Sequence, residues 1–119
     1  MHSGRETKVR LFGIDCPEHD QAFGDKAHRF TAKMVFGKVV EVEQVDKDVY
    51  GRSVAWVSVD GKSLNKELLR AGLAWWYRYY AKNEHELEKL EAEARQNKIG
   101  LWSWRNSIPP WEFRRSENR

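Results

Sequence analysis

The stretch from Val9 to Glu18 constrains the fold of this chain more than any other segment. Its first part, Lys8 to Ile14, is rich in β-branched and aromatic residues, which predicts a strand. Pro17 ends that strand, because proline lacks a backbone donor and restricts the residue before it. The turn that follows is expected to hold two carboxylates close together. Three charged side chains therefore gather at one end of the strand: Arg10, Asp15 and Glu18.

This charged trio allows two interpretations when it is taken alone. A surface strand that ends in a polar turn explains it without any chemistry, because most polar loops carry none. Arg10 lies between the apolar residues Val9 and Leu11, so its side chain points either to solvent or into a polar cleft. The trio does not decide between a surface turn and a functional cleft.

Periodicity along the rest of the chain predicts an α+β order. The predicted helices are Gln21 to Phe36, Leu64 to Ala71 and a third from Asn83 to Gly100, and the further strands are Val39 to Val45, Ser53 to Val59 and Leu73 to Tyr80. Ser63 is expected to cap the second helix. From Leu101 onward we expect an extended tail that packs through aromatic side chains. Short strands in this order can close a small barrel with helices at its ends.

Length and charge suggest one domain with a mildly basic surface. We expect a single domain over residues 1–119, with barrel and helices over 3–104 and a tail rich in proline, tryptophan and arginine over 105–119. Residues 83–98 hold five glutamates against three basic residues, net −2, so the remainder of a chain of charge +3 carries +5. A basic face suits a phosphate-chain binder, although ordinary surface charge explains it equally well. The sequence predicts neither a membrane span nor a signal peptide.

Three blocks of the sequence resemble the staphylococcal nuclease (thermonuclease) family. Val9 to Glu18 resembles the family pattern Arg-Leu-x-x-Ile/Val-Asp-x-Pro-Glu, and Asp48 to Arg52 resembles its Asp-x-Tyr-Gly-Arg block. Trp102 to Arg115 is similar to the tail of bacterial members. The resemblance runs from about Ser3 to the C-terminus. Blocks in the same order and at the same spacing are a specific signal, whereas any one alone would be weak.

The resemblance implies an OB-fold β-barrel with three helices, here truncated at the N-terminus. Family members carry two more strands before the one that matches Lys8 to Ile14, with an Asp-Gly-Asp-Thr motif between them, and we expect this chain to lack them. The strand would then expose an unpaired edge. We predict a homodimer through that edge, with partial disorder near the N-terminus as the alternative.

The resemblance also assigns catalytic roles to three residues. Arg10, Glu18 and Arg52 match the family's catalytic set, in which the glutamate orients or deprotonates a water molecule. The planar forks of the two arginines can neutralise charge on the phosphoryl oxygens. The alternative for Arg52 is a structural pair with Asp48 across the turn.

Nucleotide and metal contacts follow from the same comparison of positions. Tyr50 and Tyr80 match residues that contact the nucleotide, although packing at the barrel rim is an equally good explanation. Arg78 replaces a tyrosine of the best-known member, so phosphate contacts could be redistributed to it. The family's metal is calcium, held by the carboxylate matching Asp15, by the backbone carbonyl matching Cys16 and by an aspartate of the missing segment. We therefore expect an incomplete calcium site.

Taken together, the sequence predicts a calcium-dependent endonuclease that hydrolyses phosphodiester bonds of DNA or RNA, with single-stranded nucleic acid as its partner. The incomplete metal site is expected to impair that activity. The alternative is a non-catalytic OB-fold module that binds nucleic acid or another protein. The sequence does not fix the compartment, and members of the family are often secreted or associated with the cell envelope.

Overall fold

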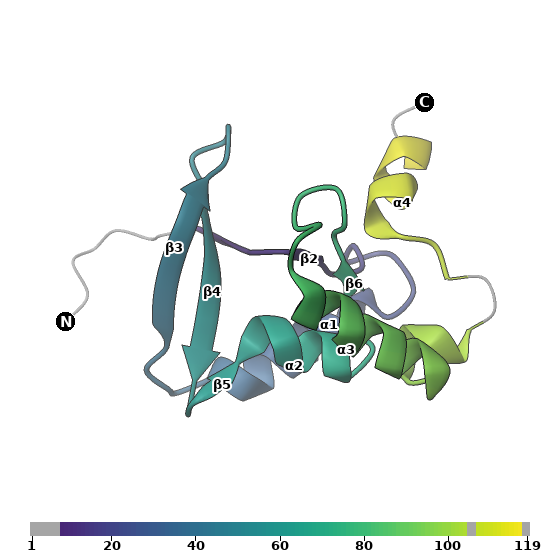
Figure 1. Ribbon diagram of the computed structural model, residues 1–119, viewed down its shortest axis with the longest axis horizontal. Coiled ribbons are helices and arrows are strands. Elements are labelled where there is room, and N and C mark those ends of the chain that lie inside the picture. The colour runs from purple at the N-terminus through teal and green to yellow at the C-terminus, as the bar shows by residue number, and fades with distance from the viewer. Residues whose placement is uncertain (1–7, 105–106, 118–119) are drawn as a thin grey trace.

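The computed structural model describes residues 8–104 and 107–117, which form a mixed α+β arrangement (Figure 1). The strands are β1 (Val9–Leu11), β2 (Ile14–Asp15), β3 (Glu41–Lys47), β4 (Ser53–Val59), β5 (Lys62–Ser63) and β6 (Trp75–Trp76). The helices are α1 (Gly24–Val35), α2 (Leu64–Arg70), α3 (His85–Gln96), the short 3-10 helix η1 (Gly100–Ser103) and α4 (Pro110–Glu117). In Figure 1 the β3–β4 hairpin stands at one end of the molecule and α4 at the other.

Strand β4 is the centre of the main sheet. It pairs in parallel with β1, from Val9 opposite Ser53 to Leu11 opposite Ala55, and antiparallel with β3 and β5. Its valine and alanine side chains are buried, which agrees with a strand covered on both faces. The bounds predicted for this strand from the sequence are confirmed.

The predicted strand Lys8 to Ile14 is wrong in one respect, because the chain bends at Gly13 and forms two strands. Gly13 has φ 77°, a left-handed conformation that suits glycine. A Cβ at this position would come within 2.5 Å of Cδ1 of Leu87, so α3 also requires a glycine there. Beyond the bend, β2 leaves the main sheet and pairs antiparallel with β6, with Ile14 opposite Trp76.

The main sheet is open over the part of the chain that the structure describes. β1 and β3 lie on opposite sides of β4, and each pairs with it along one edge. No described strand of this sheet pairs with the other edge of β1 or of β3. The strand predicted from Val39 to Val45 corresponds to β3, which begins at Glu41. Its valines are not buried, since Val42 and Val45 are 47% and 45% exposed beside its glutamates. The closed barrel that the resemblance implies is therefore not formed by the described residues.

The hydrophobic core lies between the strands and the helices α1, α2 and α3. Ile14 of β2, Leu68 and Leu69 of α2 and Leu87 of α3 are fully buried in one cluster. The predicted cap of α2 is confirmed, because the Ser63 hydroxyl accepts a hydrogen bond from the backbone N–H of Lys66 at 3.2 Å. These contacts hold the turn after β2 against the helices.

The segment after β6 corrects the prediction of a long aromatic strand. Only Trp75 and Trp76 are extended, and the chain then turns, with the backbone N–H of Tyr80 donating to the carbonyl oxygen of Tyr77 at 3.1 Å. The predicted third helix is α3, but it begins at His85 and no side chain caps it. The aromatic composition predicted a strand, whereas local turn hydrogen bonds and packing determined the structure.

The prediction of an extended tail is wrong, and the tail adds a fourth α-helix to the three expected. Pro110 is the first residue of α4, where its missing N–H has no intrahelical partner to lose. The carbonyl oxygen of Pro109 accepts from the backbone N–H groups of Glu112 and Phe113, both at 3.0 Å. Trp111 packs on Tyr77 with ring centroids 5.3 Å apart, which anchors the helix. Within the described ranges, no helix is long and apolar enough to cross a membrane.

Candidate active site

A pocket of about 350 Å³ lies beside β1, the turn between β3 and β4, and the loop after β6. Its lining includes two guanidinium groups, three phenol rings and two carboxylates. These belong to Arg10 and Arg52, to Tyr50, Tyr77 and Tyr80, and to Asp46 and Asp48. Arginines bind phosphate oxygens through paired N–H donors, and aromatic rings stack on bases. The pocket therefore has the chemistry of a nucleotide site.

Arg52 is positioned by the turn that precedes β4. Its Nε donates to Oδ2 of Asp48 at 2.6 Å, and the backbone N–H groups of Tyr50 and Arg52 donate to Oδ1 at 3.0 and 2.8 Å. Partial desolvation raises the pKa of Asp48, but these hydrogen bonds outweigh it and lower the pKa below its ordinary value. The predicted structural pair between Arg52 and Asp48 is thus present, in a side chain that also lines the pocket.

Arg10 lies in the middle of β1 and turns its side chain into the pocket, the second of the two orientations considered. Its Nη1 lies 3.8 Å from Oδ1 of Asp15. The guanidinium carbon also lies 5.6 Å from the ring centroid of Tyr77, a cation–π distance. Arg10 is therefore held on two sides near the pocket that Arg52 also lines.

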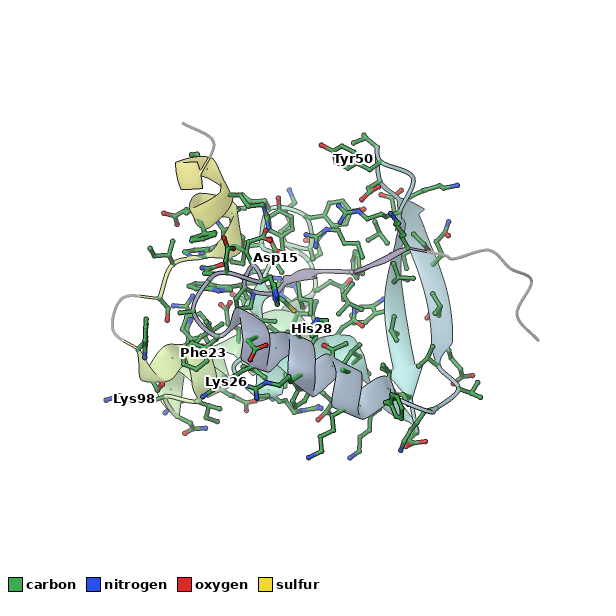
Figure 2. All side chains as sticks on the ribbon, turned by 180° about the vertical axis from the view of Figure 1, so that it is seen from behind. Asp15, Phe23, Lys26, His28, Tyr50 and Lys98 are labelled. Carbon is green, nitrogen blue, oxygen red and sulfur yellow. The ribbon has the colours of Figure 1, made fainter. Side chains whose placement is uncertain are left out.

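The tyrosines frame the pocket in different ways. The Tyr80 hydroxyl donates a hydrogen bond to Asp46, which raises the pKa of Tyr80 and lowers that of Asp46. Tyr50 lies at the tip of the hairpin turn, well away from Asp15, and is 82% exposed (Figure 2). The Arg52 guanidinium carbon lies 5.8 Å from the Tyr50 ring centroid. The Tyr80 ring is thus fixed by its hydrogen bond, whereas the exposed Tyr50 ring can contact a ligand.

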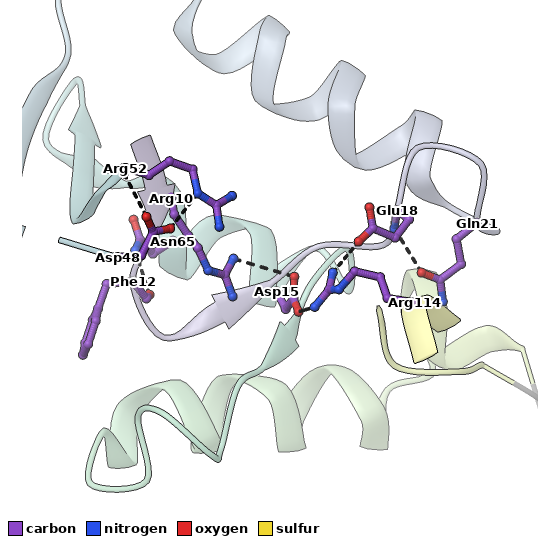
Figure 3. Close-up of polar contacts among 9 residues, drawn as sticks. All are labelled: Arg10, Phe12, Asp15, Glu18, Gln21, Asp48, Arg52, Asn65 and Arg114. Carbon is purple, nitrogen blue, oxygen red and sulfur yellow. Dashed lines mark hydrogen bonds and ion pairs between the residues drawn. The ribbon is translucent and has the colours of Figure 1, made fainter. Parts of the chain in front are cut away.

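A second charged group lies on the other side of Asp15 (Figure 3). Asp15 is buried, and its Oδ2 accepts from Nη2 of Arg114 at 2.8 Å. Nη1 of the same guanidinium donates to Oε1 of Glu18. Burial would lower the pKa of Arg114, but its hydrogen bonds to the two carboxylates raise it overall. Arg10, Asp15, Arg114 and Glu18 thus form a row of alternating charge in which Arg114 comes from α4 and the last member, Glu18, lies in the turn before α1.

The structure brings some of the predicted catalytic and metal residues together and separates others. Arg10 and Arg52 line the same pocket, and Asp15 is paired with Arg10. Glu18 lies beyond Asp15, toward α4, and is not among the lining residues (Figure 3). The backbone N–H of Glu18 donates to Oε1 of Gln21 at 3.0 Å, which fixes the Pro17 turn.

The remaining predicted residues differ in their surroundings. Tyr50 and Tyr80 line the pocket, whereas Arg78 is exposed on the neighbouring loop and is not among its lining residues. Cys16 packs its side chain against the hydrophobic core. Burial, with a smaller effect from the charge of Asp15, raises the pKa of the Cys16 thiol to about 12. The thiol is thus a packed neutral group, the usual behaviour of a free cysteine that packs as a small hydrophobic residue.

Three residues near this site were not predicted as part of it. Tyr77 contacts Arg10, Asp46 binds Tyr80, and Arg114 binds both Asp15 and Glu18. Tyr77 lies in the predicted strand Leu73 to Tyr80, and Asp46 directly follows the predicted strand Val39 to Val45. Their places beside predicted site residues could therefore have indicated that they belong to the site. Arg114 is 99 residues from Asp15 in the chain, and its sequence neighbours gave no sign of that contact.

The carboxylates were tested against the calcium ion that the resemblance implies. Calcium takes six to eight oxygen ligands. Among residues 8–104 and 107–117, no three His, Cys, Asp or Glu side chains are placed to hold a metal ion. The two candidate carboxylates, Asp15 and Glu18, are instead bridged by a guanidinium. In this arrangement the side chains do not fit a divalent cation.

Comparison with known proteins agrees with the sequence blocks. Residues 8–104 match the staphylococcal nuclease homologue family. A staphylococcal-like nuclease of Arabidopsis thaliana is 42% identical over 95% of this chain and 35% of its own length. Protein ParB of Escherichia coli is 38% identical over 93% of this chain and 68% of its own length. A micrococcal nuclease of Shigella flexneri is 36% identical over 92% of this chain and 68% of its own length.

This chain therefore spans about a third of the plant relative and about two thirds of the two bacterial relatives. The family match covers β1 through η1, the part of the chain that forms the pocket, while α4 lies outside it. With most of the chain matched to the family and relatives above 30% identity, the chain belongs to the staphylococcal nuclease homologue family.

Proposed function

We propose that this chain is a nuclease that hydrolyses phosphodiester bonds in single-stranded DNA or RNA. The observation that carries the proposal is the presence of Arg10 and Arg52 in one pocket with tyrosine rings. Membership of a nuclease-homologue family and the names of two relatives, a staphylococcal-like nuclease and a micrococcal nuclease, support the same reaction class.

The two arginines would act on the scissile phosphate. Charge develops on the phosphoryl oxygens as a water molecule attacks, and a guanidinium fork held in place beforehand stabilises that charge without reorganisation. Asp48 fixes the angle of Arg52 through Nε, and Asp15 with Tyr77 restrains Arg10. These contacts support a role for both side chains in stabilising the transition state.

The tyrosines would hold the nucleotide next to the scissile bond. Tyr50 is exposed at the pocket mouth, where a ring can stack on an unpaired base. Tyr80 keeps its proton because its hydroxyl binds Asp46, so it presents a neutral ring and hydroxyl to a polyanion. Arg78, exposed on the same loop, is proposed to contact phosphate further along the strand. Stacking on unpaired bases favours single strands over a duplex.

Glu18 is proposed as the group that orients or deprotonates the attacking water. Its carboxylate is bound by Arg114 in this conformation, so the oxygen that accepts from the guanidinium is not open to a water molecule. The role therefore requires that Arg114 move away from Glu18. This requirement distinguishes Glu18 from the two arginines, which already line the pocket.

Calcium dependence is proposed from the family resemblance, with Asp15 and the backbone carbonyl of Cys16 as ligands and with Glu18 contributing through a water molecule. Because the side chains do not fit a cation as they stand, we expect weak calcium binding. Cleavage should be poor at micromolar calcium and should improve at millimolar calcium.

The test is cleavage of labelled single-stranded DNA and RNA oligonucleotides by the full chain, with calcium or with a chelator. Arg52→Gln should abolish most of the cleavage. Arg29→Gln is the matched control, since Arg29 also pairs with an aspartate but lies on α1, outside the pocket. Equal rates for the two variants would contradict the proposal.

A second function, a non-catalytic module that binds nucleic acid, is favoured by one observation. Arg52 and Glu18 both have intramolecular partners, Asp48 and Arg114, which satisfy their charges without substrate. This alternative predicts oligonucleotide binding that depends on Arg10 and Tyr50, with no cleavage at any calcium concentration.

A homodimer through the edge of β1 remains a prediction. Within the described residues β1 has a strand partner on one side, β4, so its other edge can accept a second copy. Sedimentation velocity at tens of micromolar protein measures the association directly. A compact monomer with protected backbone amides in β1 would contradict the dimer.

A further inference from the structure

The contact between α4 and the two carboxylates has a consequence for any cation that they bind. Arg114 donates through Nη2 to Asp15 and through Nη1 to Glu18, so one guanidinium spans the gap between them. Asp15 is buried, and Arg10 faces its other oxygen. The two negative charges therefore have their counter-ions within the chain.

A divalent cation and this guanidinium cannot share the same carboxylates. The charges would stand a few ångström apart in a partly buried site, where water screens the repulsion between two like charges less than it does at the surface. Arg114 occupies one oxygen of each carboxylate, Oδ2 of Asp15 and Oε1 of Glu18, and Arg10 faces Oδ1 of Asp15. Cation binding therefore requires Arg114 to leave.

The rest of α4 is attached in a way that allows its release. Trp111 packs on the rings of Tyr77, Tyr79 and Trp75, and Nε2 of Gln21 donates to the carbonyl oxygen of Ile108. Arg114 is itself 42% exposed. Pro110 is also buried, so this packing fixes the start of the helix, whereas the ion pairs of Arg114 hold its last turn against Asp15 and Glu18.

We propose that Arg114 acts as an internal competitor of divalent cations, so that docking of α4 and cation binding at Asp15 and Glu18 exclude each other. The inference rests on the proposed calcium site and names the element that regulates it. With α4 docked, the carboxylates are neutralised and Glu18 is held. With a cation bound, Arg114 and the last turn of α4 are free, and Glu18 has lost its guanidinium partner.

The competition is measured without substrate. Calcium chloride is titrated calorimetrically into the full chain at an ionic strength of about 0.15 M, where exposed charges are screened, and hydrogen exchange follows the amides of α4. Arg114→Gln should tighten calcium binding by at least about tenfold, because it removes a positive charge from the site. In the wild type, saturating calcium should increase exchange in α4.

Arg115→Gln is the matched control. It makes the same change in net charge on the next residue of the same helix, where the side chain is exposed. Its calcium affinity should stay within about twofold of the wild type, since a distant exposed charge is screened.

If Arg114→Gln proves unstable by circular dichroism, Arg114→Lys tests the same point. It keeps the charge but loses the fork that spans two carboxylates, and it should tighten calcium binding by a smaller factor than the glutamine variant.

Three results would overturn the proposal. These are equal calcium affinities for the glutamine variants at positions 114 and 115, unchanged or weaker binding by Arg114→Lys, and full protection of α4 at saturating calcium. Each readout is independent of cleavage. A chain without nuclease activity could still show the competition, and an active nuclease could lack it, so failure of one proposal is distinguishable from failure of the other.

Discussion

Asn65 donates from Nδ2 to the carbonyl oxygen of Phe12 at 3.0 Å, so a side chain of α2 holds the end of the strand that carries Arg10. The same amide donates to the carbonyl oxygen of Ala55 at 3.2 Å, and its Oδ1 accepts from the backbone N–H of Val57 at 3.0 Å. Asn65 is completely buried. One amide thus links β1, β4 and α2 behind the pocket.

Replacing Asn65 should destabilise the fold. Asn65→Leu removes all three hydrogen bonds and leaves backbone groups buried without partners, which costs about 2 to 4 kcal/mol in the free energy of unfolding. Urea denaturation followed by tryptophan fluorescence measures the loss. Asn83→Leu, at an exposed position, is the control and should change stability by less than about 0.5 kcal/mol. Equal losses for the two variants would show that the buried network contributes little.

Gly24 is expected to control the position of the Pro17–Glu18 turn. A Cβ on this first residue of α1 would lie 1.9 Å from the carbonyl oxygen of Glu18, so Gly24→Ala must push the turn and the helix apart. We expect a loss of roughly 2 kcal/mol or more. Gly37→Ala is the comparison, because it has open space but a left-handed φ of 69°, which costs about 1 kcal/mol. Thermal denaturation should place Gly24→Ala below Gly37→Ala, and the reverse order would contradict the close contact.

The carboxyl group of Asp48 should titrate below its ordinary range. Hydrogen bonds from Arg52 and Tyr50 lower its pKa in the folded state against partial desolvation, which acts in the opposite direction. A lowered pKa means that the contribution of Asp48 to stability is present above the unfolded value of about 3.9 and is lost as pH falls through the folded pKa. Carbon-detected NMR of the Asp48 carboxyl gives the midpoint. Arg52→Gln should raise that midpoint, and an unchanged midpoint would mean that the pair is not formed in solution.

The Cys16 thiol should be unreactive in the native protein. Burial raises its pKa to about 12, and the thiolate is the reactive form, so reaction with a disulfide reagent at pH 8 should be at least about tenfold slower than in urea. Absorbance of the released chromophore follows the reaction. Similar rates in the folded and unfolded chain would mean that Cys16 is more accessible than its packing against the core indicates.

Sequence signals predicted those elements that local contacts determine. The bounds of β4 and the Ser63 cap of α2 follow from alternation and from a hydroxyl at a helix start, and the turn of Asp48 and Arg52 depends on residues four apart. Gly13 was predicted to be part of a strand, but the chain bends there at a positive φ, and the strand beyond the bend pairs with β6, far along the chain.

The candidate site shows the same division. Of the residues that the resemblance assigned to catalysis and nucleotide binding, four line one pocket and two do not. Arg10, Arg52, Tyr50 and Tyr80 are in its lining, whereas Glu18 and Arg78 are not. Arg114 was not predicted, because its role arises only when α4 folds and docks against a turn near the other end of the chain. The proline and tryptophan residues of the tail indicated an extended segment. Proline also occurs at the first position of helices, and the local sequence did not distinguish these two cases.

Arg10, Arg52 and Glu18 are proposed to act on the transition state of phosphodiester hydrolysis. The most direct measurement compares single-turnover cleavage rates with binding of a short oligonucleotide for Arg10→Lys, Arg52→Lys and Glu18→Gln at millimolar calcium. Each variant should lower the rate by on the order of a hundredfold or more while the dissociation constant changes much less, because the lost interaction strengthens only in the transition state. A parallel loss of binding and rate would contradict the account and make these residues anchors for the nucleic acid.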